Sequence, residues 1–179
     1  MIDTIASLLP ALALVSHIAF VALFVSFVFR ESWGRKMVLF IGKHSLVLGF
    51  LVSLSAVAGS LFYSEIMGFE ACILCWWQRI LIYPTVFIFA VALWRKELSA
   101  YYYIIPPVVL ASIIAVYQSY VYLGGSSLLT CTSAEGACSK IYVMAFGYVT
   151  IPLMSLTISL YILLLAWANK IYRNENHNA

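Results

Sequence analysis

The sequence predicts an all-α integral membrane protein, with a four-helix transmembrane bundle preceded by one extra N-terminal transmembrane helix. Three observations predict this fold class. Of the 179 residues, 64% are hydrophobic and 9% are charged, whereas soluble domains carry roughly 25% charged residues. The mean hydropathy is +1.01. Five apolar segments reach about the 20 residues that a spanning helix needs, and they are continuous, without the alternation of β-barrel strands.

The first span is expected to be retained in the protein. Its apolar run exceeds the roughly 7–15 residues of a signal-peptide core, and the N-terminus carries Asp3 in place of a basic region. The last span is long enough to tilt in the membrane. The expected spans are about 8–29, 44–63, 76–94, 101–123 and 142–168. The expected organisation is 1–40 for the extra helix and a basic cytoplasmic loop, 41–170 for the bundle with two external cysteine loops, and 171–179 for a polar cytoplasmic tail.

Lysine and arginine counts predict the orientation of the spans, because cytoplasmic loops carry an excess of these residues. If the N-terminus is outside, eight of them fall on the cytoplasmic side. The other side then holds Lys140, with Arg79 at its interface. Both cysteine loops therefore lie outside the cytoplasm, where disulfides form and persist. The eight residues are Arg30, Arg35, Lys36, Lys43, Arg95, Lys96, Lys170 and Arg173.

Several small or polar residues lie inside the expected spans. His17 lies in the first span and Gln118 in the fourth. Intramembrane polar residues are often functional, but the favoured interpretation of His17 is a hydrogen bond to a neighbouring helix. Neither residue is assigned a catalytic role. Ser55 and Gly59 form a small-xxx-small pair, which is expected to let two helices approach closely.

The most informative motif is the cysteine pair at the start of the third span. Cys72 and Cys75 have the spacing of a redox-active dithiol. The free N–H groups and the positive dipole end of a helix that starts near Cys75 favour a thiolate there. Arg79 lies one helical turn further on. Its permanent charge requires an anion or a polar ligand in such a dry setting.

A second pair, Cys131 and Cys138, lies in a loop between the fourth and fifth spans. Flexible loop residues precede it, so the pair is expected to be accessible. Thiol exchange with a partner protein requires such access. Two alternatives stay open. The four cysteines could form a zinc site, although six residues separate the second pair where two to four are usual. They could also form two static structural disulfides.

These residues resemble a known family. The run from Cys72 to Arg79, Cys-Ile-Leu-Cys-Trp-Trp-Gln-Arg, resembles the signature of the disulfide bond formation protein B family, which includes DsbB and the relatives called BdbC. The run that begins at Cys138 and includes Phe-Gly-Tyr-Val-Thr-Ile-Pro at 146–152 resembles the segment after that family's second cysteine pair. The resemblance covers roughly residues 40–170.

The resemblance implies a multi-pass oxidoreductase of the bacterial inner membrane. Such an enzyme reoxidises a thioredoxin-like, DsbA-like thiol oxidase outside the cytoplasm and passes the electrons to a quinone, either ubiquinone or menaquinone. It implies that Cys131 and Cys138 exchange with the partner, and that Cys72 and Cys75 lie next to the quinone. It also implies that the Cys75 thiolate contacts the quinone and that Arg79 helps to bind it. The partners expected are this oxidase, lipid and quinone, with no nucleic acid and no metal.

Three departures from the family pattern stand out. The first span is additional, the loop between Cys131 and Cys138 is short, and Gln78 stands where an acidic residue is often found. Two rival functions remain at this stage. One is a quinone-linked enzyme like the vitamin K epoxide reductases, whose active cysteine pair occurs late in the chain. The other is a non-enzymatic membrane scaffold with structural disulfides.

Overall fold

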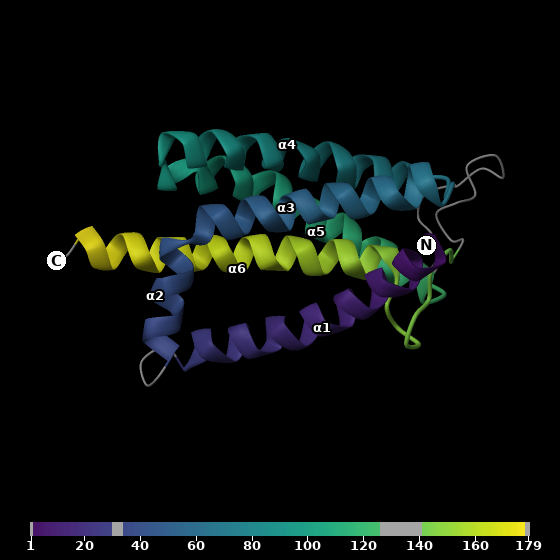
Figure 1. Cartoon of the computed structure of the whole chain (residues 1–179), viewed down its shortest axis with the longest axis horizontal. Coiled ribbons are helices and arrows are strands. Elements are labelled where there is room, and N and C mark those ends of the chain that lie inside the picture. Colours follow the sequence, from purple (N-terminus) through teal and green to yellow (C-terminus); the bar gives the residue numbers. More distant parts are fainter. Residues whose placement is uncertain (1, 30–33, 126–140, 178–179) are drawn as a thin grey trace.

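The computed structural model describes residues 2–29, 34–125 and 141–177. Within these ranges every regular element is helical, apart from an isolated bridge between Ala145 and Val149. Figure 1 shows α1, α3, α4, α5 and α6 running lengthwise, with the two termini at opposite ends. The elements are α1 (Ile2–Val28), α2 (Arg35–Lys43), α3 (Ser45–Leu61), the π-helical turn η2 (Phe62–Ile66), α4 (Ile73–Arg95), the 3-10 turn η3 (Leu98–Ala100), α5 (Tyr101–Tyr122) and α6 (Ile151–His177).

The predicted fold class is confirmed. Within the described residues, five helices are long and apolar enough to cross a membrane, and each overlaps one of the five expected segments. The fifth expected segment starts too early, however, because α6 begins at Ile151 and not near 142. It also continues through the polar residues of the expected tail as far as His177. The candidate spans are Leu8–Val28, Ser45–Ile66, Ile73–Arg95, Leu98–Tyr122 and Ile151–Glu175.

The late start of α6 has a backbone cause. Phe146 and Gly147 have φ angles of 53° and 79°, values in the left-handed region that a right-handed helix does not contain. They form a turn that closes with a hydrogen bond from the Val149 amide to the Ala145 carbonyl at 2.9 Å. Pro152 follows as the second residue of α6, where its missing N–H costs no helical bond. The segment before 151 is therefore a folded turn.

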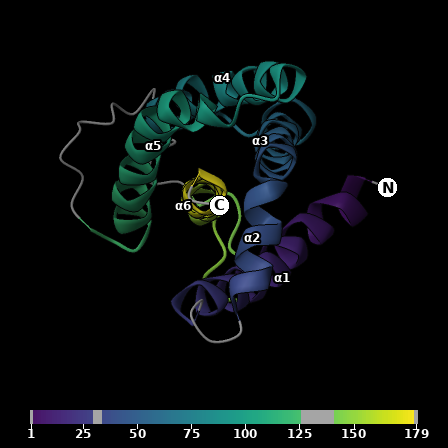
Figure 2. The same cartoon turned by 90° about the vertical axis from the view of Figure 1, so that its left-hand side faces the viewer.

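The helices form a bundle around α6. Figure 2, along the bundle, shows α6 near the centre, with α3, α4 and α5 on one side and α1 and α2 on the other. Helix α6 packs against α2, α3 and α5, and α4 packs between α3 and α5. Helix α1 makes fewer contacts, and only a small share of its residues is buried. It is thus the most loosely packed of the five spans.

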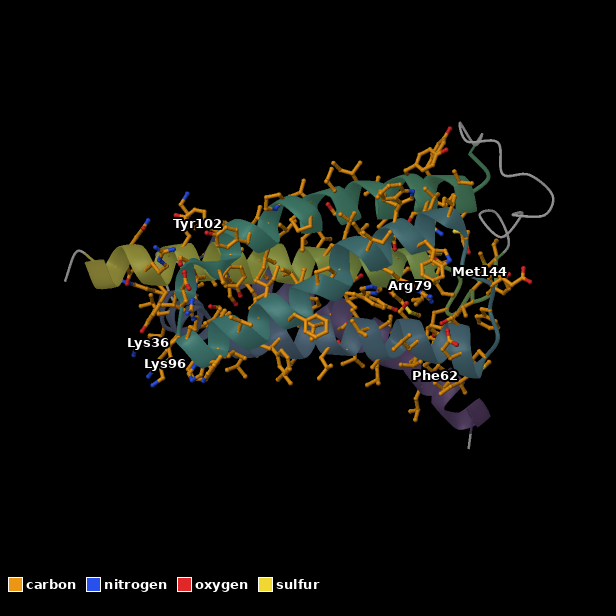
Figure 3. The ribbon with its side chains drawn as sticks, turned by 90° about the horizontal axis from the view of Figure 1, so that it is seen from above. Lys36, Phe62, Arg79, Lys96, Tyr102 and Met144 are labelled. Carbon is orange, nitrogen blue, oxygen red and sulfur yellow. The ribbon has the colours of Figure 1, made fainter. Side chains whose placement is uncertain are left out.

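The two ends of the bundle differ in charge. Figure 3 places Lys36 and Lys96 at one end, and Arg79 and Met144 toward the other. We call the first the basic end. The second, where α4 begins beside Cys72, we call the cysteine end. Helix α2, which lies where a basic loop is expected from the sequence, is found at the basic end between α1 and α3. It has two basic residues at its start and buries Val38 and Ile41.

The basic end is closely packed. A Cβ atom added to Gly49 would lie 2.4 Å from the ring of Phe89, which is fully buried. A Cβ atom on Gly42 of α2 would lie 2.6 Å from the Ala168 carbonyl oxygen of α6. Because lipid offers no hydrophobic drive between helices, such close approach and interhelical hydrogen bonds hold the bundle together. Tyr101 donates one such bond to the Ser45 carbonyl at 2.8 Å.

The expected role of Ser55 and Gly59 is wrong. A Cβ atom on Gly59 would meet nothing within 4 Å, so none of the described helices approaches closely there. Both residues instead line a cavity described below. Gly42 and Gly49 are small residues that do permit close helix packing, and they lie on either side of the junction between α2 and α3.

Candidate functional site

The cysteine pair sits at the N-terminal end of α4. Cys72 is the N-cap, with an extended backbone, and its carbonyl accepts the first helical bond from Trp76 at 3.0 Å. Cys75 lies in the first turn. The two Sγ atoms are 3.2 Å apart, a hydrogen-bond distance well beyond the roughly 2.05 Å of a disulfide. The helix starts at Ile73, slightly earlier than expected, so the unpaired N–H groups and positive dipole end lie beside both sulfurs.

Gln118 on α5 contacts both sulfurs. Its Nε2 atom lies 3.4 Å from the Sγ of Cys72 and 3.4 Å from the Sγ of Cys75. Gln78, one turn after the cysteines on α4, donates from its own Nε2 to the Oε1 of Gln118 at 3.0 Å. Both amide side chains are buried. The sequence marked Gln118 as an intramembrane polar residue but did not place it beside the thiols, because the register of α5 against α4 is set by tertiary packing.

Arg79 is held by α3. Its Nε donates to the Oγ of Ser60 at 3.0 Å, and its NH2 group donates to the Ser60 carbonyl at 3.2 Å. Tyr83 donates to the same Ser60 hydroxyl at 3.1 Å. The guanidinium also lies over the ring of Trp76, 5.3 Å from its centroid, within cation–π range. The polar ligand expected for the charge of Arg79 is therefore supplied in part by Ser60.

A half-open cavity of about 450 Å³ lies at the cysteine end of the bundle. Cys75, Arg79 and Gln78 line it from α4, and Ser60 lines it from α3. Most of its wall is apolar and comes from four helices, with contributions such as Leu12 of α1, Val52 of α3, Ile82 of α4 and Ile158 of α6. Figure 3 shows that Arg79 lies toward this end of the molecule, as do the labelled Phe62 and Met144. The site thus combines sulfur, a cation and an apolar chamber.

Tyr63 adds an unsatisfied polar group to this region. It belongs to the π-helical turn η2 and lines the cavity. Its hydroxyl is buried and has no hydrogen-bond partner within the described ranges. Single π-helical turns occur frequently at functional sites, and a buried orphan hydroxyl carries a cost that a bound oxygen atom would relieve. No sequence pattern indicates this residue, since a π-turn depends on local packing.

The second predicted pair, Cys131 and Cys138, lies outside the described residues. The segment that follows them does pack at the cysteine end. The ring of Tyr142 stacks on Phe69 with centroids 4.8 Å apart, and Phe69 stacks in turn on Tyr63 at 5.8 Å. Phe69 belongs to the short connection that leads to Cys72. The chain therefore returns from the second cysteine loop next to the connection that carries the first pair.

The interpretation of His17 as a residue bonded to a neighbouring helix is confirmed. Its Nε2 lies 2.8 Å from the Oγ1 of Thr157 on α6, and its Nδ1 lies 3.3 Å from the hydroxyl of Tyr148. Because Thr157 donates its own proton to the Leu153 carbonyl, Nε2 is assigned as the donor to Thr157. Tyr161 of α6 also donates to the Ser16 carbonyl. These bonds attach the middle of α1 to α6 beside the cavity.

Comparisons with known proteins agree with this architecture. The family model "Disulfide bond formation protein DsbB" matches residues 42–169, a range that starts within α2 and excludes α1. The chain is 39% identical over 113 residues to the "SPbeta prophage-derived disulfide bond formation protein B" of Bacillus subtilis, covering 63% of this chain and 76% of that protein.

A second relative covers more of both chains. The "Probable disulfide formation protein C 2" of Bacillus anthracis is 32% identical over 136 residues, which are 76% of this chain and 97% of that protein. The "Disulfide bond formation protein C" of Bacillus subtilis is 36% identical over 113 residues, 62% of this chain and 81% of that protein. No solved structure matches the chain significantly. The matched model and these relatives show that the chain belongs to the DsbB family of disulfide bond formation proteins.

Proposed function

We propose that this protein is a membrane thiol:quinone oxidoreductase that reoxidises a thioredoxin-like, DsbA-like dithiol oxidase outside the cytoplasm. Its family supports the coarser statement, that it is a disulfide oxidoreductase acting in disulfide bond formation. The observation that carries the finer proposal is the position of Cys75. Its side chain lines an apolar cavity within the membrane-spanning bundle, together with the cation of Arg79.

The residues around the cavity fit a quinone. A volume of about 450 Å³ lies within the roughly 300–1,000 Å³ of small-molecule sites, which are mostly apolar with a few polar groups. A quinone has a flat apolar ring and two carbonyl oxygens. Arg79 and Tyr63 are the residues that would donate to those oxygens, since Tyr63 has a buried hydroxyl without a partner in the described part of the chain. When bound, the quinone supplies a two-electron oxidant.

The chain's own residues perform the thiol chemistry. In the proposed cycle, a reduced partner thiolate attacks the Cys131–Cys138 disulfide. The reduced Cys131–Cys138 pair then exchanges with the Cys72–Cys75 disulfide, which leaves Cys72 and Cys75 as a dithiol. As the disulfide between Cys72 and Cys75 forms again, the pair loses two electrons and two protons, which reduce one quinone to a quinol. The helix start beside both sulfurs stabilises the thiolate that each exchange step needs.

Turnover tests the proposal directly. The full-length protein in lipid nanodiscs would be mixed with a reduced thioredoxin-like dithiol oxidase and with either a ubiquinone or a menaquinone analogue. We expect the ultraviolet absorbance of the quinone to fall as the partner is oxidised, in equal molar amounts. Oxidation of the partner without quinone reduction, or no turnover with either analogue, would reject the proposal. Two inert disulfides would instead indicate a scaffold.

Orientation is part of the same proposal. We infer that the cysteine end faces the outside of a bacterial inner membrane and the basic end faces the cytoplasm. The support is the clustering of basic residues such as Lys36 and Lys96 at one end. After reduction, a membrane-impermeant maleimide added outside intact cells should label Cys131 and Cys138. A single cysteine introduced by Lys96→Cys should stay unlabelled, and the reverse pattern would overturn the orientation.

A further inference from the structure

The two buried glutamines beside the sulfurs form a chain of hydrogen bonds. Gln78 donates to the Oε1 of Gln118 at 3.0 Å, and the Nε2 of Gln118 lies 3.4 Å from each Sγ of the cysteine pair. Gln118 is 1% exposed and Gln78 is 8% exposed. The two side chains come from different helices, α5 and α4, so the chain of bonds crosses the helix interface before it reaches the thiols.

We propose that Gln118 is a further catalytic residue, which donates N–H to the sulfur that carries the negative charge, and that Gln78 is the positioning residue that orients it. This proposal rests on the thiol chemistry proposed above. An amide group has a donor side and an acceptor side. If Gln118 were turned over, its Oε1 would face two sulfurs and would repel a thiolate. The N–H of Gln78 holds that oxygen on the opposite side, so the donor side faces the sulfurs.

The equal distances to the two sulfurs matter for the reaction. A carboxamide nitrogen carries two N–H groups, so Gln118 can serve either cysteine without moving. Negative charge changes place during exchange, since one sulfur is the attacking thiolate and the other is the leaving one. From the state with one thiolate, formation of the Cys72–Cys75 bond releases two electrons and one proton to the quinone. The other proton left the pair when the thiolate formed, so the dithiol loses two protons in total, as in the cycle above.

Burial gives this donor its strength. Hydrogen bonds to a charged acceptor are stronger than neutral ones, and a low local dielectric increases the effect. Gln118 has no titrating group, so its donor side is present at every pH. Arg79 by contrast directs its Nε and NH2 toward Ser60 on α3. The two residues therefore have different roles: Gln118 donates to the sulfurs, and Arg79 binds the ligand in the cavity.

Thiol reactivity tests the role of Gln118 without any quinone. In full-length protein with Cys131→Ser and Cys138→Ser, the reduced pair would be alkylated with iodoacetamide over a range of pH. We expect Gln118→Met to slow alkylation at neutral pH about tenfold, the effect of losing one charge-assisted hydrogen bond, and to move the pH profile upward. An unchanged rate and profile would overturn the proposal. Because the assay needs no turnover, it can succeed even where the proposed quinone reaction fails.

A double variant tests the positioning role of Gln78. Gln78→Met should slow alkylation in the same direction by a smaller factor, because Gln118 is then free to turn over. If Gln78 acts through Gln118, the Gln78→Met, Gln118→Met double variant should react no more slowly than Gln118→Met alone. If the two substitutions instead slow alkylation by factors that multiply in the double variant, Gln78 does not act through Gln118. Gln118→Asn, which keeps the amide on a shorter chain, should recover part of the rate if a donor is what the sulfurs need.

A matched control separates reactivity from folding. Thr85 of α4 is also buried, and its Oγ1 lies 3.1 Å from the Oγ of Ser53 on α3, a hydrogen-bond distance across the helix interface. Thr85→Val removes an interhelical bond of similar length without touching the sulfurs. It should lower the melting temperature in detergent as much as the glutamine variants do, while leaving the alkylation profile unchanged. If Thr85→Val slows alkylation equally, the glutamines have only a structural role.

Discussion

The two ends of the bundle are built from the same helices but are packed for different purposes. At the basic end, Gly49 brings α3 against the buried ring of Phe89, and Tyr101 bonds back to Ser45. At the cysteine end, Gly59 faces open space and lines a cavity with Cys75. Helix α3 is thus closely packed in its first half, around Gly49, and not in its second half, around Gly59. The basic end therefore supplies rigidity, while the cysteine end supplies space and polar chemistry.

The largest expected effect concerns the cysteine end. Cys75→Ser should reduce quinone reduction to the uncatalysed background, because the sulfur that lines the cavity is lost and no disulfide with Cys72 can form. The Cys131–Cys138 disulfide should stay intact, which mass spectrometry after alkylation would verify. Quinone absorbance during turnover with a reduced partner is the measurement.

Ser155 of α6 supplies the control for that experiment, since it lines the same cavity without carrying redox chemistry. Ser155→Ala should keep nearly full turnover. Full turnover by Cys75→Ser would exclude the quinone step at this cysteine and would make the cavity irrelevant to the chemistry.

The next effect in size concerns Arg79. Arg79→Ala should raise the KM for quinone about tenfold or more, the magnitude of a lost hydrogen bond to a charged donor. Arg79→Lys keeps the charge but loses the planar fork that binds Ser60 at two points, so it should recover only part of the affinity. The initial rate at varied quinone concentration gives KM. An unchanged KM in Arg79→Ala would remove this residue from the binding site.

A pair of glycine substitutions compares the two ends directly. Gly49→Ala should destabilise the protein by about 1–2 kcal/mol, because the added methyl group meets the buried Phe89 ring. Gly59→Ala should leave the free energy of unfolding within about 0.5 kcal/mol, since nothing lies within 4 Å of the new atom. It should alter the KM for quinone instead. Reversible unfolding in mixed detergent micelles measures both, and equal destabilisation would contradict the division into a rigid end and an open end.

Much of this architecture follows from composition and spacing. The five spans and the position of the cysteine pair at a helix start could be predicted, because apolar length and the CxxC motif are local signals. The hydrogen-bond partners of the polar side chains could not be predicted. Ser60 binds Arg79 and Gln118 contacts both sulfurs, and these pairings depend on how α3 and α5 are rotated against α4. A uniformly apolar helix in lipid gives little information about that rotation, since every face is apolar.

Local backbone geometry accounts for the other errors. The turn at Phe146 and Gly147 delays the start of α6, although the surrounding residues are apolar enough to continue a span. Helix α2 is hard to predict because it is short and has both basic and apolar residues, a pattern that resembles a cytoplasmic loop. Ser55 and Gly59 match a packing motif but line the cavity. Small residues create space, and only the tertiary structure decides whether a helix or a ligand fills it.

The smallest expected effect concerns α1, which lies outside the family match yet supplies Leu12 and Ser16 to the cavity wall. His17→Ala removes the bonds that join α1 to Thr157 and Tyr148. An interhelical bond in a membrane contributes about 0.6 kcal/mol on average, so the KM for quinone should rise roughly threefold. Ser26→Ala is the matched control, because Ser26 bonds only to Ala22 of its own helix among the described contacts. If both variants bind quinone equally well, the wall formed by α1 does not contribute to the site, and the four helices of the matched bundle bind the ligand by themselves.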